Sequence, residues 1–82
     1  MDKKIRISIL GLGHVGLPTA LGFAQIGWEV TGTDSDLAKL DLISEGIVPF
    51  YEPGITEMLK KYLKEGSFKV EKEQSKTIKD AE

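Results

Sequence analysis

Residues 5–18 read IRISILGLGHVGLP, and this stretch decides the fold. Isoleucines at positions 5, 7 and 9 alternate with polar residues, which predicts a β-strand over about residues 4–10. Glycines at positions 11, 13 and 16 then form a G-x-G-x-x-G turn. Apolar residues at helical spacing follow to about Ile26, and Gly27 ends this helix. A strand, a glycine-rich turn and an amphipathic helix in direct succession are typical of a nucleotide-binding α/β domain.

The strand-like alternation and the helical spacing of apolar residues both recur further along the chain. A second short strand is expected over residues 28–33, directly before Asp34. Ser35 or Asp36 caps the next helix, which ends at Gly46. A loop to Tyr51 follows.

The last part of the chain adds a helix and a strand. Residues 52–54, Glu-Pro-Gly, open a third helix, and Gly66 closes it. One face of this helix is expected to be apolar and consists of Ile55, Leu59 and Leu63. A third short strand lies around Phe68 and Val70, and a helical turn begins at Ser75 or Thr77.

The predicted order β-α-β-α-α-β indicates the α/β class. We expect a partial Rossmann (doubly wound) fold: a three-stranded parallel sheet with flanking helices. The first strand of such a sheet normally has a neighbour on both sides, and residues 1–82 provide one on one side only. We therefore expect these residues to be the N-terminal part of a dinucleotide-binding domain, a fragment without a substrate domain. The open strand edge is predicted to recruit another chain or to be capped by a rearranged tail, which a monomer with that edge in water would refute.

Composition excludes several other classes. The chain has 82 residues and a mass of 9.0 kDa, enough for one domain at most. No apolar run approaches the ~18 residues of a membrane-spanning helix. The net charge of −2 and the interleaved lysines and glutamates near the end argue against nucleic-acid binding. With no cysteine, the chain has no disulfide, zinc-thiolate site or thiol nucleophile. The lack of cysteine gives no signal about the redox compartment, and a cytoplasmic location is the default expectation.

The glycine turn has a physical reason at each position. Gly11 permits the tight turn, Gly13 lets a pyrophosphate approach the backbone, and Gly16 lets helix and strand pack closely. The N–H groups at the start of the helix attract phosphate. The candidate cofactor-binding residues of this turn are Gly11, Leu12, Gly13, His14, Val15 and Gly16.

Asp34 is the second part of the candidate site. It lies 18 residues after Gly16, close to the ~20 that the dinucleotide fingerprint requires. A carboxylate here accepts hydrogen bonds from ribose hydroxyls and repels a 2′-phosphate, which favours NAD over NADP. The nearest following cation is Lys39. No paired carboxylates or metal-ligand cluster are visible, so we predict no catalytic residue and no metal site in these residues.

These residues, together with the segment Pro49-Phe50-Tyr51-Glu52-Pro53-Gly54-Ile55, resemble the N-terminus of the UDP-glucose/GDP-mannose dehydrogenase family. The resemblance covers essentially the whole chain, and Tyr-Glu-Pro-Gly is its most specific motif. It implies a nucleotide-sugar 6-dehydrogenase, which oxidises a sugar primary alcohol to a carboxylate in two NAD-dependent steps on a cysteine. It also implies that Asp34 and Lys39 hold the adenosine ribose, that Tyr51–Gly54 is a supporting loop, and that the parent enzyme is a homo-oligomer binding a nucleotide sugar.

Two departures limit what the resemblance implies. His14 stands where the family usually has tyrosine, and the chain has no cysteine, so these residues alone are expected to be catalytically inert. Two alternatives remain open from the sequence. One is the cofactor half of a β-hydroxyacid dehydrogenase, and the other is a nucleotide-binding module without chemistry.

Overall fold

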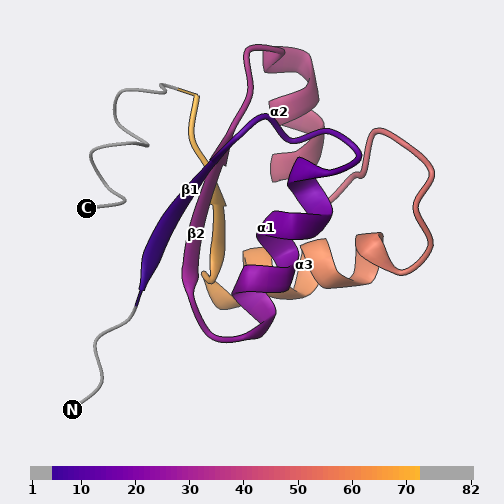
Figure 1. Cartoon of the computed structure of the whole chain (residues 1–82). Coiled ribbons are helices and arrows are strands. Elements are labelled where there is room, and N and C mark those ends of the chain that lie inside the picture. The colour runs from indigo at the N-terminus through magenta and orange to yellow at the C-terminus, as the bar shows by residue number, and fades with distance from the viewer. Residues whose placement is uncertain (1–4, 73–82) are drawn as a thin grey trace.

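The computed structural model describes residues 5–72. The strands and helices follow one another in the expected order: β1 (Arg6–Leu10), α1 (Gly16–Gln25), β2 (Glu29–Thr33), α2 (Leu37–Ser44), α3 (Ile55–Glu65) and β3 (Phe68–Val70) (Figure 1). The α/β prediction is therefore confirmed. The expected start of β1 at Lys4 and the helical turn at Ser75 or Thr77 lie outside the described residues.

The three strands form one parallel sheet in the order β1-β2-β3. All three helices lie on the same side of this sheet, and no described element covers its other face (Figure 1). Within residues 5–72, β2 is the central strand, and no described strand lies beside the second edge of β1. The carboxyl ends of β1 and β2 meet at one edge, because Leu10 is in register with Thr33. The glycine turn follows β1 and Asp34 follows β2, so both lie at this edge of the sheet.

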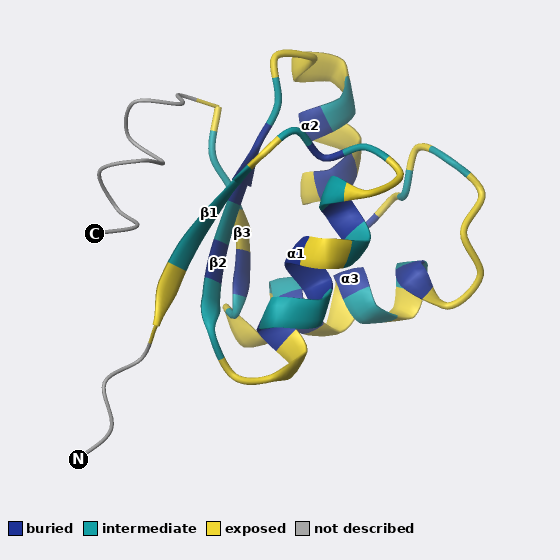
Figure 2. Ribbon diagram, in the orientation of Figure 1, coloured by how far each residue is buried: buried dark blue, intermediate teal, exposed yellow. Residues whose placement is uncertain are grey.

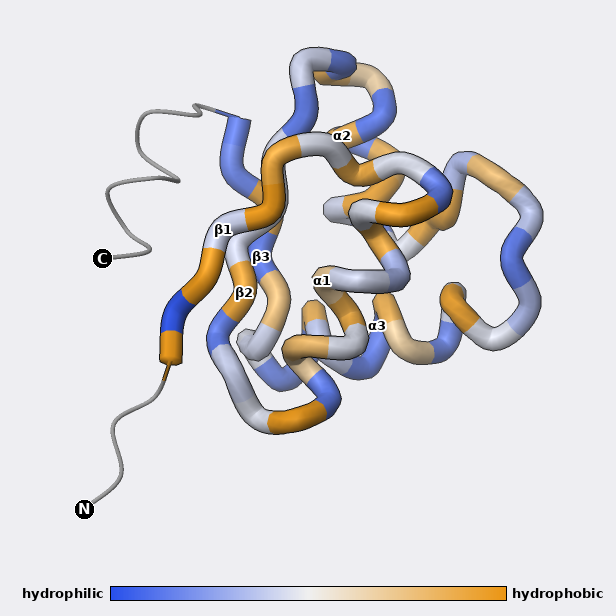
Figure 3. The backbone as a smooth tube through the Cα atoms, in the orientation of Figure 1, coloured by the Kyte–Doolittle hydropathy of each residue, from blue (hydrophilic) through white to orange (hydrophobic). Residues whose placement is uncertain are grey.

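The core lies between the sheet and the helices, where the buried segments gather (Figure 2). Hydrophobic and hydrophilic residues alternate along the chain, as the tube in Figure 3 shows. The core contains Leu17, Ala20, Leu21 and Ala24 of α1, Leu40 and Ile43 of α2, and Val30 and Phe68 of the sheet. Leu12 of the glycine turn is also fully buried in this core.

The apolar face of α3 differs in one position from the prediction. Ile55 and Leu59 are buried as expected, but the third buried residue is Tyr62, and Leu63 is only partly buried. An α-helix has 3.6 residues per turn, so Tyr62 and Leu63 lie on opposite sides of the line through Ile55 and Leu59 that faces the core. The larger aromatic ring occupies the buried side.

Local signals explain where the helices begin and end. Gly27, Gly46 and Gly66 follow the helices with φ values of 99°, 84° and 82°, a left-handed backbone that glycine adopts readily. Asp36 caps α2, because its carboxylate accepts a hydrogen bond of 3.1 Å from the Lys39 amide. Of the two N-cap candidates for α2, Ser35 and Asp36, the cap is therefore Asp36.

Replacing Asp36 by alanine is expected to lower the free energy of unfolding by about 1 kcal/mol, because the Lys39 amide loses its acceptor. Ser35→Ala is the matched control, since the neighbouring Ser35 is exposed and does not cap the helix; its effect is expected to stay within about 0.5 kcal/mol. Urea unfolding measures both. Equal losses of unfolding free energy in the two variants would contradict this assignment of the cap.

Candidate cofactor site

The glycine turn between β1 and α1 is compact. Gly11 has a φ of 101°, and its amide donates a 2.8 Å hydrogen bond to the carbonyl oxygen of Thr33 at the end of β2. A Cβ on Gly16 would overlap the carbonyl oxygen of Gly11 and lie 2.9 Å from its carbonyl carbon. Gly11 is therefore required by its backbone conformation, and Gly16 by the close approach of α1 to the end of β1.

Gly13 differs from these two glycines. A Cβ built on it meets no atom within 4 Å, and its φ is not positive. Neither packing nor backbone conformation therefore requires glycine at this position. The open space above the turn is the volume that a ligand approaching the backbone would need.

The N-terminus of α1 suits an anion. Its N-cap residue, Val15, makes no side-chain cap, and its first turn contains no acidic residue. In the other two described helices, Asp36 caps α2, and Glu57 lies in the first turn of α3. The positive end of the α1 dipole is therefore not neutralised by a carboxylate from the helix's own first turn or cap.

The remaining residues of the turn point in different directions. Leu12 is fully buried and its amide donates a hydrogen bond to Asp34, whereas Val15 is 79% exposed. His14 is exposed, and its ring lies against the ring of Phe50, with 4.3 Å between the centroids. This contact joins the turn to the loop between α2 and α3.

Asp34 lies directly after β2 and is held by three donors. Its Oδ2 accepts hydrogen bonds from the Leu12 amide at 2.8 Å and from Lys39 Nζ at 3.1 Å, and its Oδ1 accepts one from the Asp36 amide at 2.9 Å. The side chain is only 10% exposed. A carboxylate has about four acceptor positions, so roughly one remains on Oδ1 for a ligand hydroxyl.

The hydrogen bonds from the Asp36 and Leu12 amides, assisted by Lys39, hold the pKa of Asp34 below its ordinary value of 3.8, although partial burial acts in the opposite direction. The carboxylate is therefore ionised at neutral pH. Lys39 projects from the first turn of α2 and forms an ion pair with this carboxylate.

The lowered pKa of Asp34 predicts a pH dependence of stability. A group whose pKa is lower in the folded than in the unfolded chain stabilises the fold above its unfolded value, and this contribution is lost as the pH falls through the folded value. The difference in unfolding free energy between the wild type and Asp34→Asn is therefore expected to be largest above about pH 5 and to shrink as the pH falls below 3.8. Urea titrations at several pH values measure it. A difference that grows on acidification would contradict the role of these hydrogen bonds.

A cavity of about 330 Å³ lies beside the turn. It is lined by residues from the turn, α2 and the following loop: Gly13, His14, Asp36, Ala38, Lys39, Leu42, Pro49 and Phe50. Sequence reasoning missed Phe50 and Pro49 as wall residues, although both belong to the motif that carries the family resemblance. Tyr51 in the same loop is 88% exposed, and Gly54 is the N-cap of α3 with a φ of 85°.

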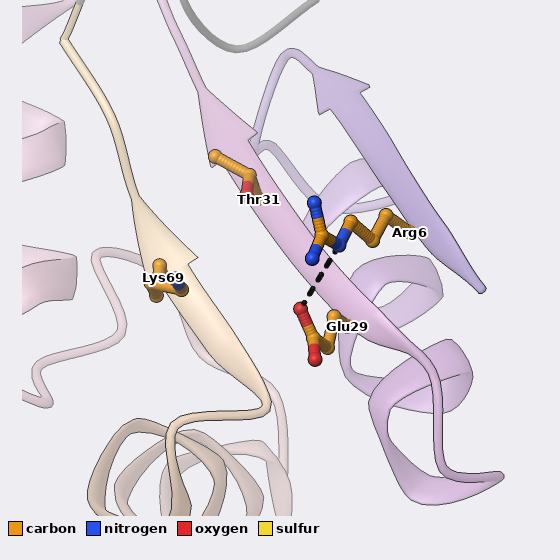
Figure 4. A pocket seen from close by; sticks show the side chains of 4 residues that line it. All are labelled: Arg6, Glu29, Thr31 and Lys69. Carbon is orange, nitrogen blue, oxygen red and sulfur yellow. Dashed lines mark ion pairs between the residues drawn. The ribbon is translucent and has the colours of Figure 1, made fainter. Parts of the chain in front are cut away.

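A second hollow, of about 170 Å³, lies on the uncovered face of the sheet and shares no lining residue with this cavity (Figure 4). Its side chains are Arg6, Glu29, Thr31 and Lys69, and Arg6 Nε lies 3.5 Å from Glu29 Oε1. The hollow is open and follows the sheet surface, and none of the candidate cofactor residues lines it.

Within residues 5–72, no group of three or more His, Cys, Asp or Glu side chains is arranged to hold a metal ion. In the same part of the chain, no helix is both long and apolar enough to cross a membrane.

Comparison with known proteins identifies similar chains. Residues 5–82 match the UDP-glucose/GDP-mannose dehydrogenase family, NAD binding domain. A UDP-glucose 6-dehydrogenase from Bacillus subtilis is 35% identical over 78 residues, which cover 95% of this chain and 18% of the relative. A UDP-N-acetyl-D-mannosamine dehydrogenase from Pyrococcus horikoshii is 42% identical over 66 residues, covering 80% of this chain and 16% of the relative.

The fold is shared as well. The solved structure of a UDP-glucose dehydrogenase from Pyrobaculum islandicum matches with a TM-score of 0.89 at 32% identity, and the match covers 93% of this chain and 18% of that one. The Rossmann-like architecture expected from the sequence is therefore confirmed. The chain spans at most 18% of the length of these three proteins.

Proposed function

Because this chain belongs to the UDP-glucose/GDP-mannose dehydrogenase family and matches its NAD-binding domain, we propose that Gly11–Gly16, Asp34 and Lys39 bind the adenosine half of NAD. The observation that carries this proposal is the Asp34 carboxylate, ionised and held between the Leu12 amide and Lys39 at the carboxyl end of β2. The parent activity that we propose is the NAD-dependent oxidation of a nucleotide sugar at its primary alcohol. When bound, NAD supplies the hydride acceptor.

The residues present fit the pyrophosphate of NAD. The N-terminus of α1 has neither a side-chain cap nor an acidic neighbour in its first turn, and the space above Gly13 is open. Amide N–H groups and the helix dipole stabilise two phosphate charges without a cationic side chain. The turn therefore binds the diphosphate through its backbone.

The ribose is held by a carboxylate and an ammonium group. Asp34 accepts a hydrogen bond from one hydroxyl at the position that remains on Oδ1, and Lys39 donates to the other with an N–H that its ion pair leaves available. Because the Asp34 charge offsets that of Lys39, a 2′-phosphate meets no unpaired cation there. NAD is thus bound in preference to NADP.

The 82 residues contribute cofactor binding and no catalytic group. The chain contains no cysteine, and the reaction of the family as described above requires one. The isolated chain is therefore inert as a dehydrogenase. NAD reduction by the purified chain with UDP-glucose would contradict this.

The test compares NAD with its two halves by isothermal titration calorimetry. ADP-ribose is expected to bind within about threefold of NAD, and nicotinamide mononucleotide not to bind measurably, because Asp34 and Lys39 contact the adenosine ribose and no proposed group contacts the nicotinamide ribose or ring. Lys39→Ala is expected to weaken NAD binding about tenfold, or about 1.4 kcal/mol. Lys64→Ala is the matched control, since it removes the same charge from an exposed position on α3. Tighter binding of nicotinamide mononucleotide than of ADP-ribose would refute the proposal.

A further inference from the structure

Strand β2 contains a glycine, Gly32, one residue before its carboxyl end, that contacts no ligand in the proposed function. Glycine weakens a strand, and within one it often marks a place where another group approaches closely. A Cβ built on Gly32 would lie 2.8 and 3.0 Å from the two methyl carbons of Leu12, and 3.2 Å from Cε1 of Phe68. Hydrogen is therefore the only side chain that fits beneath Leu12 at its present depth.

Both neighbours lie inside the core. Leu12 is 0% exposed and Phe68 is 1% exposed, and both belong to the core. Core side chains are packed at close to crystal density, so an added methyl group displaces its neighbours. The neighbour in closest contact is Leu12, a residue of the glycine turn.

Three successive residues at the end of β2 hold this turn. Gly32 contacts the Leu12 side chain, Thr33 accepts the 2.8 Å hydrogen bond from the Gly11 amide, and Asp34 accepts the 2.8 Å hydrogen bond from the Leu12 amide. The side chain that packs on Gly32 and the amide that binds Asp34 belong to the same residue, Leu12, so a shift of the side chain also moves the amide. The Leu12 amide in turn fixes Asp34 Oδ2.

We propose that Gly32 is a positioning residue for the nucleotide. Its missing side chain lets Leu12 sit deep on β2, and Leu12 then places the turn and the Asp34 carboxylate for the pyrophosphate and ribose. The inference rests on the proposed function for the identity of the ligand. The link from Gly32 to Asp34 belongs to the unliganded chain and can be measured without a ligand.

The first test compares Gly32→Ala with Val30→Ala. Val30 lies on the same strand and the same face, two residues earlier, and is 1% exposed, so its truncation damages the core at a position further from the carboxyl end of β2. At a temperature where circular dichroism shows both variants folded, Gly32→Ala is expected to weaken NAD binding about tenfold or more and Val30→Ala less than about twofold. Equal NAD affinities in the two variants would overturn the proposal.

The second test needs no ligand. In the unliganded wild type, the NMR shift of the Leu12 amide is expected to follow the titration of Asp34, its acceptor. Gly32→Ala is expected to reduce this pH-dependent shift to less than about half, and Val30→Ala to leave it unchanged. If the wild type binds no NAD, the proposed function fails, but this titration still decides whether Gly32 positions the turn. An unaltered Leu12 shift in Gly32→Ala would overturn the positioning role.

A compensating variant covers the case in which Gly32→Ala does not fold. Leu12→Val removes one methylene, and Gly32→Ala adds one methyl group, so the double variant nearly conserves volume. The double variant is expected to fold and to bind NAD within about threefold of the wild type. A double variant that gains nothing over Gly32→Ala in folding or in NAD affinity would contradict the proposed contact.

Discussion

Gly13→Ala is expected to abolish measurable NAD binding and to leave the stability of the fold within about 0.5 kcal/mol of the wild type. A Cβ at this position meets no protein atom within 4 Å, so the protein itself tolerates alanine. The same volume is needed by a pyrophosphate that approaches the backbone of the turn. We expect a loss of at least about 100-fold in affinity, or about 2.7 kcal/mol.

Calorimetric titration with NAD and urea unfolding together measure this effect. Gly22→Ala is the matched control, because Gly22 lies inside α1 and a Cβ there also meets nothing within 4 Å. That variant is expected to bind NAD like the wild type and to gain up to about 1 kcal/mol from helix propensity. NAD affinity within threefold of the wild type in Gly13→Ala would mean that the pyrophosphate does not cross this glycine.

Asp34→Asn is expected to change the preference between NAD and NADP. Asparagine retains an acceptor oxygen for the Leu12 amide but removes the charge that neutralises Lys39, which lies 3.1 Å away. NAD loses a charged ribose acceptor, while a 2′-phosphate gains an unpaired ammonium and loses a repelling carboxylate. We expect the ratio of the two affinities to shift toward NADP by about 100-fold.

The control for net charge is Asp41→Asn. Asp41 lies on α2, is 60% exposed, and pairs with Lys72 at 3.1 Å on the surface. Its replacement removes the same charge from the chain but away from the site, so the NAD-to-NADP ratio is expected to stay within about twofold. Equal shifts in the ratio for Asp34→Asn and Asp41→Asn would show that overall charge, and not the carboxylate at the end of β2, sets the preference.

The sequence predicted the elements of this fold because each has strong local signals. The alternation at residues 5–10, the left-handed glycines after the helices and the cap at Asp36 act within a few residues of the chain. The spacing from Gly16 to Asp34 also sufficed to place the two parts of the site together, since parallel strands of one sheet end at the same edge.

What the sequence did not predict depends on contacts between distant residues. Phe50 reaches the site through its ring contact with His14, 36 residues earlier in the chain, and no local pattern encodes that contact. Tyr62 rather than Leu63 faces the core because packing chooses between two neighbouring helix positions. Gly32 did carry a signal, a glycine inside a strand, but the group that approaches it is revealed only by the structure.

The central claim is that this chain contains the adenosine half of an NAD site. The most direct measurement is an amide NMR spectrum of the 82-residue chain, titrated first with NAD and then with NADP. We predict dispersed peaks in which the amides of Gly11–Gly16 and Asp34 shift with NAD and remain in place with NADP. Shifts confined to other residues, or equal responses of these amides to both dinucleotides, would contradict the account.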